Sequence, residues 1–146
     1  MPKSSERPLL LDTHVWLWFV EGDGDRLAAS IPRRLERAAH QGTLLVSAIS
    51  LWEIGMLSAK GRVAITDLPH WILTSRRVPG IRVTPVDDLV AVGSAELPAP
   101  LHGDPADRLI AATARELDAT LVTCDAELIA YGALGRLRVM DARAGG

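Results

Sequence analysis

The sequence predicts an α/β fold in which helices flank a central parallel β-sheet on both faces. Short apolar runs alternate along the chain with segments that carry the apolar spacing of helices. The chain has 146 residues, 48% of them hydrophobic, which is enough for one domain with a buried core. The sequence contains no internal repeat, low-complexity block or long linker. We therefore expect a single domain over residues 1–146, with its core at about 9–140, a polar N-terminal arm and a Gly-rich C-terminal tail.

In the first half of the chain, glycines mark the expected ends of the elements. Gly22 and Gly24 follow an apolar segment, Gly42 stops a helix, and Gly61 ends another. The expected elements are a strand at 9–12, an apolar segment at 15–19, a helix at about 27–39, a strand at 44–47, a helix at about 49–59 and a helix at about 66–78.

In the second half, prolines give the clearest boundaries. Pro98 and Pro100 stop one helix, and Asp104-Pro105 is a strong start for the next, with Asp as N-cap and Pro at the first helical position. The expected elements are an alternating strand at 81–86, a helix at 87–97, a helix introduced by 102–108 and running to about 117, a strand at 120–124, a short helix through 131 and a strand near 137–140. The tail at 142–146 is expected to fray.

Composition argues against a membrane protein and against a disulfide-stabilised one. No apolar stretch approaches the roughly 20 residues needed to span a bilayer. The polar start of the chain is followed by an apolar run too short for a secretory signal. Cys124 is the only cysteine, so no internal disulfide can form. These features lead us to expect a cytoplasmic location.

Four carboxylates occur where the expected strands and helices meet. Asp12 closes one apolar run and Asp125 closes another. Asp107 opens the helix that leads into the second run, and Glu53 lies early in the helix after the strand at 44–47. In a parallel sheet all these positions lie near the edge formed by the carboxyl ends of the strands, where open α/β sheets place their sites. We therefore expect the four acids to converge.

A cluster of four acids predicts a metal site. Like charges that are held together repel each other and shift each other's pKa values unless a cation compensates them. Mg²⁺ or Mn²⁺ is the natural occupant because both ions favour oxygen ligands. This donor set favours metal-assisted phosphodiester chemistry.

Three of the acids also have a structural explanation. Asp12 and Asp125 could each cap the helix that follows. Asp107, three residues after the expected N-cap Asp104, could complete a capping arrangement or interact with the helix dipole. Judged singly, each acid is open to either interpretation, and the metal hypothesis rests on the four together.

Glu53 is harder to explain as a structural residue. Its neighbours at helical spacing are Ile49, Met56 and Leu57, so the glutamate is expected to face the interior. An unpaired charge there is costly. Its partner could be a cation or, in a purely structural role, Arg108.

Other catalytic chemistries lack their sequence patterns. One cysteine and four scattered histidines give no zinc spacing, and neither glycine-rich nucleotide-binding motif is present. Ser47 and Ser50 have no nucleophile-elbow context. His14, close to Asp12, could contact substrate or act as a general acid or base, or it could be a structural helix residue.

The charge of the chain permits a nucleic-acid partner without requiring one. The formal net charge is −2, but if four of the 18 acids belong to a metal site, 14 remain against 16 basic residues. Arginine supplies all the basic residues except Lys3 and Lys60. Its planar guanidinium suits phosphate, although a compositional bias toward arginine would give the same ratio.

Three segments give the chain a family resemblance. They are LLLDTHVWLW near the start, SAISLWEIGMLSAKGR in the first half and HGDPADRLIAATARELDATLVTCDAEL near the end. In this order and spacing they resemble the PIN-domain ribonucleases, specifically the VapC-type toxins of type II toxin–antitoxin systems, from Leu9 to Met140. The chain departs from the familiar DPFDR form at Ala106, which replaces an aromatic residue.

The resemblance assigns roles to particular residues. The metal-binding and catalytic quartet corresponds to Asp12, Glu53, Asp107 and Asp125, and the residues that accompany it or contact substrate correspond to Thr13, Asp104, Arg108 and Thr123. The implied activity is hydrolysis of RNA phosphodiester bonds with Mg²⁺ or Mn²⁺. The implied partners are a second copy of the chain and a small antitoxin that forms a hetero-oligomer with it, and no membrane is implied.

Three other functions compete with this interpretation. The first is a PIN nuclease that is not a toxin and acts in RNA maturation or on DNA. The second is a phospho-receiver signalling domain, which needs a lysine after a late strand, where this chain has none. The third is a non-catalytic interaction module, which the presence of all four acids disfavours.

Overall fold

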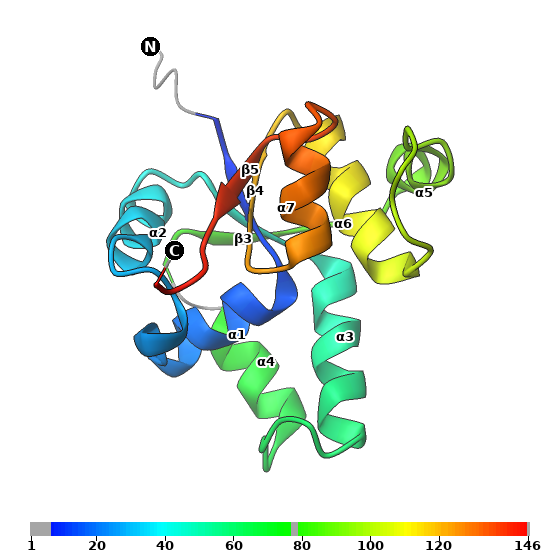
Figure 1. Ribbon diagram of the computed structural model, residues 1–146. Helices are drawn as coiled ribbons and strands as arrows, with labels where there is room; N and C mark the ends of the chain where they lie inside the picture. Colours follow the sequence, from blue (N-terminus) through cyan, green and yellow to red (C-terminus); the bar gives the residue numbers. More distant parts are fainter. Residues whose placement is uncertain (1–6, 77–78, 146) are drawn as a thin grey trace.

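The centre of the protein is a parallel sheet of five strands. The computed structural model describes residues 7–76 and 79–145. The strand order is β3-β2-β1-β4-β5, and every pairing is parallel (Figure 1). The strands are β1 (Leu9–Leu11), β2 (Leu44–Ser47), β3 (Ile81–Thr84), β4 (Thr120–Thr123) and β5 (Val139–Asp141). The predicted α/β architecture is confirmed.

Helices cover both faces of this sheet. They are α1 (Thr13–Glu21), the short 3₁₀ helix η1 (Gly24–Arg26), α2 (Ile31–His40), α3 (Ala48–Ala59), α4 (Leu68–Arg76), α5 (Asp88–Ala95), α6 (Pro105–Glu116) and α7 (Ala126–Ala133). Figure 1 shows α2 on one side of the strands and α5, α6 and α7 on the other. No helix in the described ranges is long and apolar enough to cross a membrane.

Neighbouring residues of β1, β2, β4 and β5 contribute to opposite layers of the core. In β1, Leu10 packs in the layer that holds Leu121 and Ile110, whereas Leu11 packs in the layer that holds Trp16 and Val122. All six are fully buried. This alternation follows from the two-residue period of a strand, and a parallel sheet covered on both faces requires apolar residues at both positions.

The order of the strands creates a crevice at β1. This strand has β2 on one side and β4 on the other, so the chain crosses over in opposite directions from it. In open α/β sheets, ligands bind at such a switch point, outside the carboxyl ends of the strands. Asp12 lies there, and its backbone N–H donates to Val122 at 3.0 Å.

Two expectations, about the start of the second helix and about the C-terminal tail, were wrong. The helix expected from Leu27 begins at Ile31, because Leu27 forms an antiparallel bridge with Arg143. The C-terminal tail does not fray at its start, because Ala142 is fully buried and accepts a hydrogen bond from the Ala28 N–H at 2.9 Å. Each segment therefore fixes the other.

The remaining boundaries differ from expectation by a few residues. The strand expected at 81–86 ends at Thr84, and the next helix starts after the N-cap Asp87, which accepts from Val90 N–H at 2.9 Å. The last strand lies at 139–141 instead of 137–140. The helix expected at 66–78 spans Leu68–Arg76, and residues 77–78 lie outside the described part of the chain.

Candidate metal centre

The four predicted acids come from elements that begin or end at the carboxyl edge of the sheet. Asp12 and Asp125 are the N-caps of α1 and α7, Asp107 lies in the first turn of α6, and Glu53 lies in the second turn of α3. Asp107 is close enough to the other three, and to Asp104, for each of them to disfavour its ionisation. The fold thus gathers these carboxylates at the crevice.

Asp12 is the most enclosed of the acids, with 8% of its surface exposed. Its Oδ1 accepts from the Thr13 N–H at 2.8 Å, and its Oδ2 accepts from the Thr123 hydroxyl at 2.6 Å. Burial raises its pKa, although the hydrogen bonds from Thr123 and Thr13 oppose that shift. Capping and a place in the acid cluster are therefore compatible roles for one side chain.

A chain of hydroxyls holds Glu53. The Thr13 hydroxyl donates to Glu53 Oε1 and lies 2.8 Å from the Ser50 hydroxyl. Since Thr13 gives its proton to Glu53, Ser50 is the donor in the second bond. Burial raises the pKa of Glu53, and the nearby Asp12 adds to that effect. Ser50 was considered in the sequence only as a nucleophile, and its contact with Thr13 gives it a positioning role instead.

Asp107 combines a capped backbone with a strongly perturbed carboxylate. Its N–H donates to Asp104 Oδ1 at 3.1 Å, which identifies Asp104 as the N-cap of α6. Burial, followed by repulsion from Asp12 and Asp104 and from the other acids, raises the pKa of Asp107 to about 8. The expected capping role of Asp104 is borne out by this geometry.

His102 joins the site and was missed in the sequence. Its Nδ1 accepts from the Asp104 N–H at 3.1 Å, so the proton of the neutral ring is on Nε2. That Nε2 lies 3.2 Å from Asp107 Oδ2 and 3.3 Å from Glu127 Oε2. Position two residues before an expected N-cap is the local signal that could have indicated this histidine.

Asp125 is linked to Asp12 through a shared threonine. Asp125 Oδ1 caps α7 by accepting from the N–H groups of Glu127 at 2.8 Å and Leu128 at 3.0 Å. Its own N–H donates to the Thr123 hydroxyl at 3.0 Å, and that hydroxyl donates to Asp12. Thr123 thus couples the positions of two carboxylates on different strand ends.

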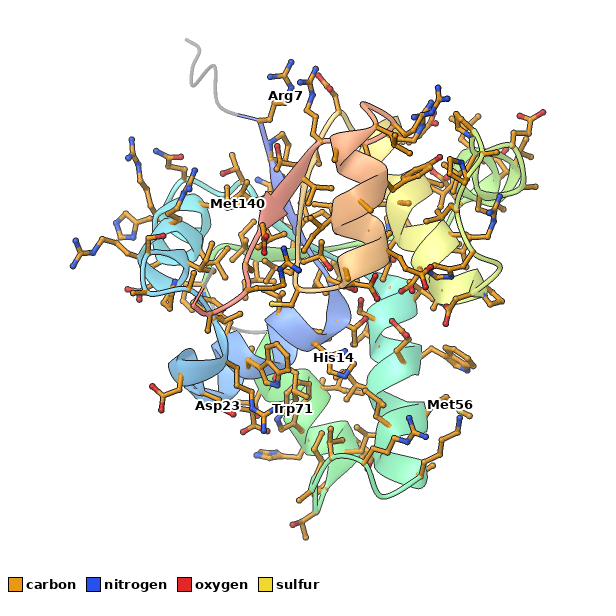
Figure 2. All side chains as sticks on the ribbon, viewed as in Figure 1. Arg7, His14, Asp23, Met56, Trp71 and Met140 are labelled. Carbon is orange, nitrogen blue, oxygen red and sulfur yellow. The ribbon has the colours of Figure 1, made fainter. Side chains whose placement is uncertain are left out.

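Of the two partners left open for Glu53, Arg108 is excluded, and the expected interior face of α3 is only partly buried. Arg108 donates to the carbonyls of Ser94 at 3.1 Å and Leu101 at 3.3 Å, so it ties the end of α5 to α6, whereas the partner of Glu53 is Thr13. The apolar face of α3 is not interior throughout: Trp52 is 57% exposed and Met56, which Figure 2 shows projecting from the helix, is 38% exposed.

The four acids offer the carboxylate oxygens that a hard cation prefers. In their present orientations, however, the side chains do not point at a common position where an ion could bind. Within residues 7–76 and 79–145, no three His, Cys, Asp or Glu side chains have the arrangement of a metal site. Their oxygens are engaged by internal donors such as Thr13, Thr123 and His102. Burial is the main cause of the raised pKa values of Asp12, Glu53 and Asp107, and repulsion from neighbouring acids adds to it. Side-chain rotation would be needed to bind one ion.

A cavity of about 300 Å³ opens beside the acids. Glu53 and Asp104 lie on its wall, together with the apolar Trp52 and Met56 and the basic Arg62. This combination offers a partner both apolar and charged contacts next to the carboxylates.

The sequence matches a known protein family and a known ribonuclease. A model of the PIN domain family matches residues 9–134. Ribonuclease VapC22 from Mycobacterium tuberculosis (strain ATCC 25618 / H37Rv) is 34% identical over 120 residues, which cover 82% of this chain and 88% of that protein.

Solved structures share the fold at low identity. VapBC2 from Rickettsia felis, bound to a DNA fragment from their promoter, gives a TM-score of 0.67 at 19% identity, covering 92% of this chain and 98% of the matched one. VapBC-5 from Mycobacterium tuberculosis, of the VapBC family of toxin–antitoxin systems, gives 0.59 at 19% identity, covering 93% and 99%. These two likenesses support the fold.

Proposed function

This chain belongs to the PIN domain family, and we propose that it is a metal-dependent endoribonuclease of the VapC type that acts as the toxin of a toxin–antitoxin pair. The observation that carries the proposal is the proximity of Asp12, Glu53 and Asp107 at the crevice beside β1. Burial and mutual repulsion raise the pKa values of all three. The 34% identity to Ribonuclease VapC22 supports RNA as the substrate.

The metal would be Mg²⁺ or Mn²⁺, held by Asp12, Glu53, Asp107 and Asp125. These side chains supply only carboxylate oxygens, the donors that both ions prefer. A bound ion of this kind polarises a phosphate and lowers the pKa of a water ligand, which makes hydrolysis of a phosphodiester possible.

The residues around the quartet position it. Thr13, supported by Ser50, fixes Glu53, and Thr123 fixes both Asp12 and the backbone of Asp125. His102 presents its Nε2 proton to Asp107 and limits the directions in which that carboxylate can turn. Such supporting contacts set ligand orientation, and their loss typically lowers metal affinity.

The partners that we propose are RNA as substrate, a second copy of the chain, and a small antitoxin. The solved relatives are VapBC complexes, one of them bound to promoter DNA, which supports an antitoxin that also reaches DNA. In this chain Trp52 and Met56 expose apolar surface on the cavity that includes Glu53. An antitoxin segment seated there would cover this apolar surface and obstruct access to the acids.

Cleavage of single-stranded RNA by the purified protein tests the activity. We expect Mg²⁺ or Mn²⁺ to support cleavage, EDTA to stop it, and Zn²⁺ to substitute poorly because the site offers no nitrogen or sulfur ligand in the quartet. Asp12→Asn should reduce the rate by at least about 100-fold. Unchanged cleavage in EDTA, or by the variant, would contradict the metal site.

Induction in growing cells tests the toxin role separately. The wild-type protein should arrest growth, Asp12→Asn should not, and co-expression of a small gene encoded beside it should restore growth. If the protein cleaves RNA in vitro but its induction leaves growth unchanged, the activity is that of a non-toxin PIN nuclease.

A further inference from the structure

Arginines gather at the amino edge of the sheet, opposite the acids. Two cavities of about 410 and 140 Å³ open there, among the residues that precede β1, β2, β4 and β5 and along α2. Figure 2 shows Arg7 at this end of the sheet and His14 at the other end. His14 is close enough to Asp12 to lower the pKa of that carboxylate. The arginines that line the two cavities are Arg7, Arg34, Arg37, Arg115, Arg136 and Arg138.

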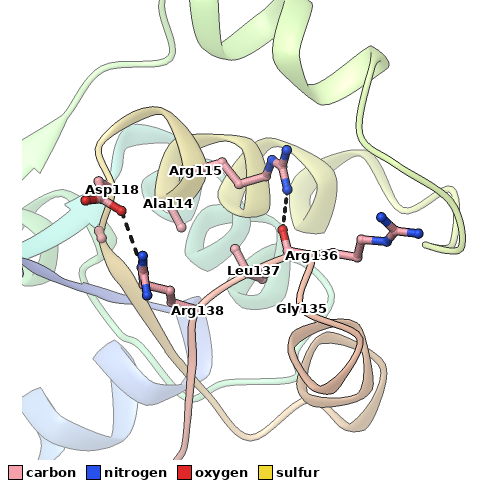
Figure 3. Close-up of a pocket in the computed structure, with 8 residues that line it drawn as sticks. Ala114, Arg115, Asp118, Gly135, Arg136, Leu137 and Arg138 are labelled. Carbon is pink, nitrogen blue, oxygen red and sulfur yellow. Dashed lines mark hydrogen bonds and ion pairs between the residues drawn. The ribbon is translucent and has the colours of Figure 1, made fainter.

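One aspartate joins the two cavities. Asp118, which lines the larger cavity, accepts from Arg138 Nε on one oxygen and from Arg7 Nε on the other, both at 3.3 Å. Arg7 lines the smaller cavity, and Figure 3 shows the bond between Asp118 and Arg138. One carboxylate cannot neutralise two guanidinium groups, so positive charge remains at the junction. The same two arginines lower the pKa of Asp118.

A further contact orders the larger cavity. The Arg115 side chain donates to the carbonyl of Arg136, as Figure 3 shows, so its guanidinium is held at the rim beside Leu137. Among residues 7–76 and 79–145, Asp118 is the one acid that lines either cavity, against six arginines. The edge as a whole is therefore basic in a chain whose formal net charge is −2.

Contacts that stabilise the fold do not explain all the arginines at this edge. Arg115 lies in the last turn of α6, where a cation is favoured by the helix dipole, and Arg7 and Arg138 pair with Asp118. Arg34 and Arg136, by contrast, are exposed and make no side-chain hydrogen bond within the described part of the chain. Unpaired exposed arginines near other arginines add repulsion, and exposed ion pairs contribute only about 0–1 kcal/mol each.

We propose that this arginine edge binds the phosphate backbone of a folded RNA whose scissile bond lies at the acids; the inference rests on the proposed function. The carboxylates of the crevice repel RNA wherever no cation compensates them. Because phosphate contacts dominate the affinity of proteins for nucleic acids, most of the affinity for RNA has to come from another, basic surface. The strands hold three or four residues. At about 3.3 Å per residue the sheet is roughly 10–13 Å deep. A folded RNA is long enough to reach both edges, whereas an oligonucleotide of about two nucleotides, at about 3.4 Å per nucleotide, is not.

The test compares a double variant with a matched control. Arg34→Gln with Arg136→Gln removes one charge from each cavity without breaking a side-chain hydrogen bond. Arg33→Gln is the control, since Arg33 precedes Arg34 on α2, is exposed, and lines neither cavity. Two substrates are needed: a hairpin RNA of about 16 base pairs with single-stranded ends and an oligonucleotide of about two nucleotides, which is too short to reach both edges. Thermal melting first verifies that all variants remain folded.

Binding of the hairpin is measured in EDTA, so it does not depend on cleavage. The double variant should bind roughly tenfold more weakly at about 0.1 M salt, and its slope of log K against log salt should be smaller by about 1.8. With Mg²⁺, kcat/KM should fall by the same factor for the hairpin and stay unchanged for the short oligonucleotide. The Arg33→Gln control should stay within about twofold of wild type.

Several outcomes would overturn the inference. Hairpin affinity equal to wild type, or equal losses on hairpin and oligonucleotide, would exclude a remote RNA site. A duplex DNA of the same length is measured beside the hairpin, and a loss of affinity for the DNA alone would assign the edge to DNA instead. If the protein cleaves no RNA yet the hairpin binds through Arg34 and Arg136, the proposed nuclease function fails while the RNA contact stands.

Discussion

At the scale of single residues, the acids of this site carry two roles at once. Asp12 and Asp125 cap the helices that follow them, and the same side chains lie at the crevice with Asp107. A capping carboxylate must sit at the start of a helix, and helices of a parallel α/β fold start at the carboxyl edge of the sheet. Helix capping and membership of the acid cluster therefore both require these aspartates at the carboxyl edge of the sheet.

Substitutions at Asp104 and at Asp107 should have different effects on stability and on RNA cleavage. Asp104→Asn should keep the cap on the Asp107 N–H and change stability and cleavage little, whereas Asp104→Ala should cost about 1 kcal/mol of stability. Asp107→Asn should remove a metal ligand and reduce cleavage at least about 100-fold. Paired cleavage assays and thermal melts with and without Mg²⁺ measure both effects, because a ligand that binds the folded state raises its stability. A reversed pattern would make Asp104 the ligand and Asp107 the structural residue.

The raised pKa of Asp107 predicts a pH dependence of stability in EDTA. Its pKa is about 8 in the folded protein against an ordinary value of 3.8, so folding favours the protonated form. This stabilisation is complete below about pH 4 and is lost as the pH rises through about 8. Asp12 and Glu53, whose pKa values are also raised, act in the same direction.

Thermal melts in EDTA measure this effect between about pH 5 and about pH 8. The melting temperature of the wild type should fall across this range, and Asp107→Asn should flatten the fall. Saturating Mg²⁺ should also reduce it, since a cation favours the ionised carboxylates. A wild-type melting temperature that rises with pH in EDTA would contradict the predicted sign.

At the scale of elements, the distance between a turn and its neighbouring helix decides whether a glycine in that turn can be replaced by a residue with a side chain. Gly80, just before β3, has φ +88°, and a Cβ there would lie 1.7 Å from the carbonyl oxygen of Ala39 in α2. Gly61, after α3, has φ +69° and open space around the same position. Both turns need a positive φ, but only the first also needs the missing side chain.

Gly80→Ala should therefore destabilise the protein more than Gly61→Ala. We expect about 1–2 kcal/mol for Gly61→Ala from backbone strain alone. Gly80→Ala should cost about 2–5 kcal/mol, because displacement of α2 adds about 1–3 kcal/mol to the same strain. Urea denaturation measures both values. Equal costs would mean that α2 moves freely relative to the Gly80 turn.

At the scale of the whole molecule, the segment after β5 closes one layer of the core. The Ala142 N–H donates to Thr123 and its carbonyl accepts from Ala28, both at 2.9 Å. Ala142 itself is fully buried in the layer that holds Ile31 and Leu35. The end of the chain thus links α2 to β4, the strand that leads to Asp125.

Removal of this segment should lower stability. Truncation after Asp141 loses two hydrogen bonds of about 0.5–1.5 kcal/mol each together with the burial of Ala142, so we expect a loss of about 2 kcal/mol or more. Truncation after Arg143 keeps those contacts and should have little effect. Chemical denaturation compares the two. Equal stability of both truncations would show that the Ala142 contacts contribute nothing.

The sequence by itself determined the alternation of strands and helices and the place of the acids along the chain. Both follow from local features, namely hydrophobic period, proline and glycine positions, and capping residues. Asp12, Asp107 and Asp125 could be placed at one edge because every strand of a parallel sheet ends on the same side. Glu53 was assigned correctly to its helix, although part of the apolar face that suggested its burial is exposed at Trp52 and Met56.

Only the tertiary structure decided which side chains meet. Thr123 donates to Asp12 across 111 positions of sequence and Thr13 to Glu53 across 40, and Arg108 turns to backbone carbonyls instead of to the acids. The order of the strands places β4 beside β1, and the packing of α3 brings Glu53 to Thr13. Local patterns contain neither the strand order nor the helix packing. The contacts that orient the carboxylates, and the gathering of arginines at the opposite edge, therefore exist only in the folded chain.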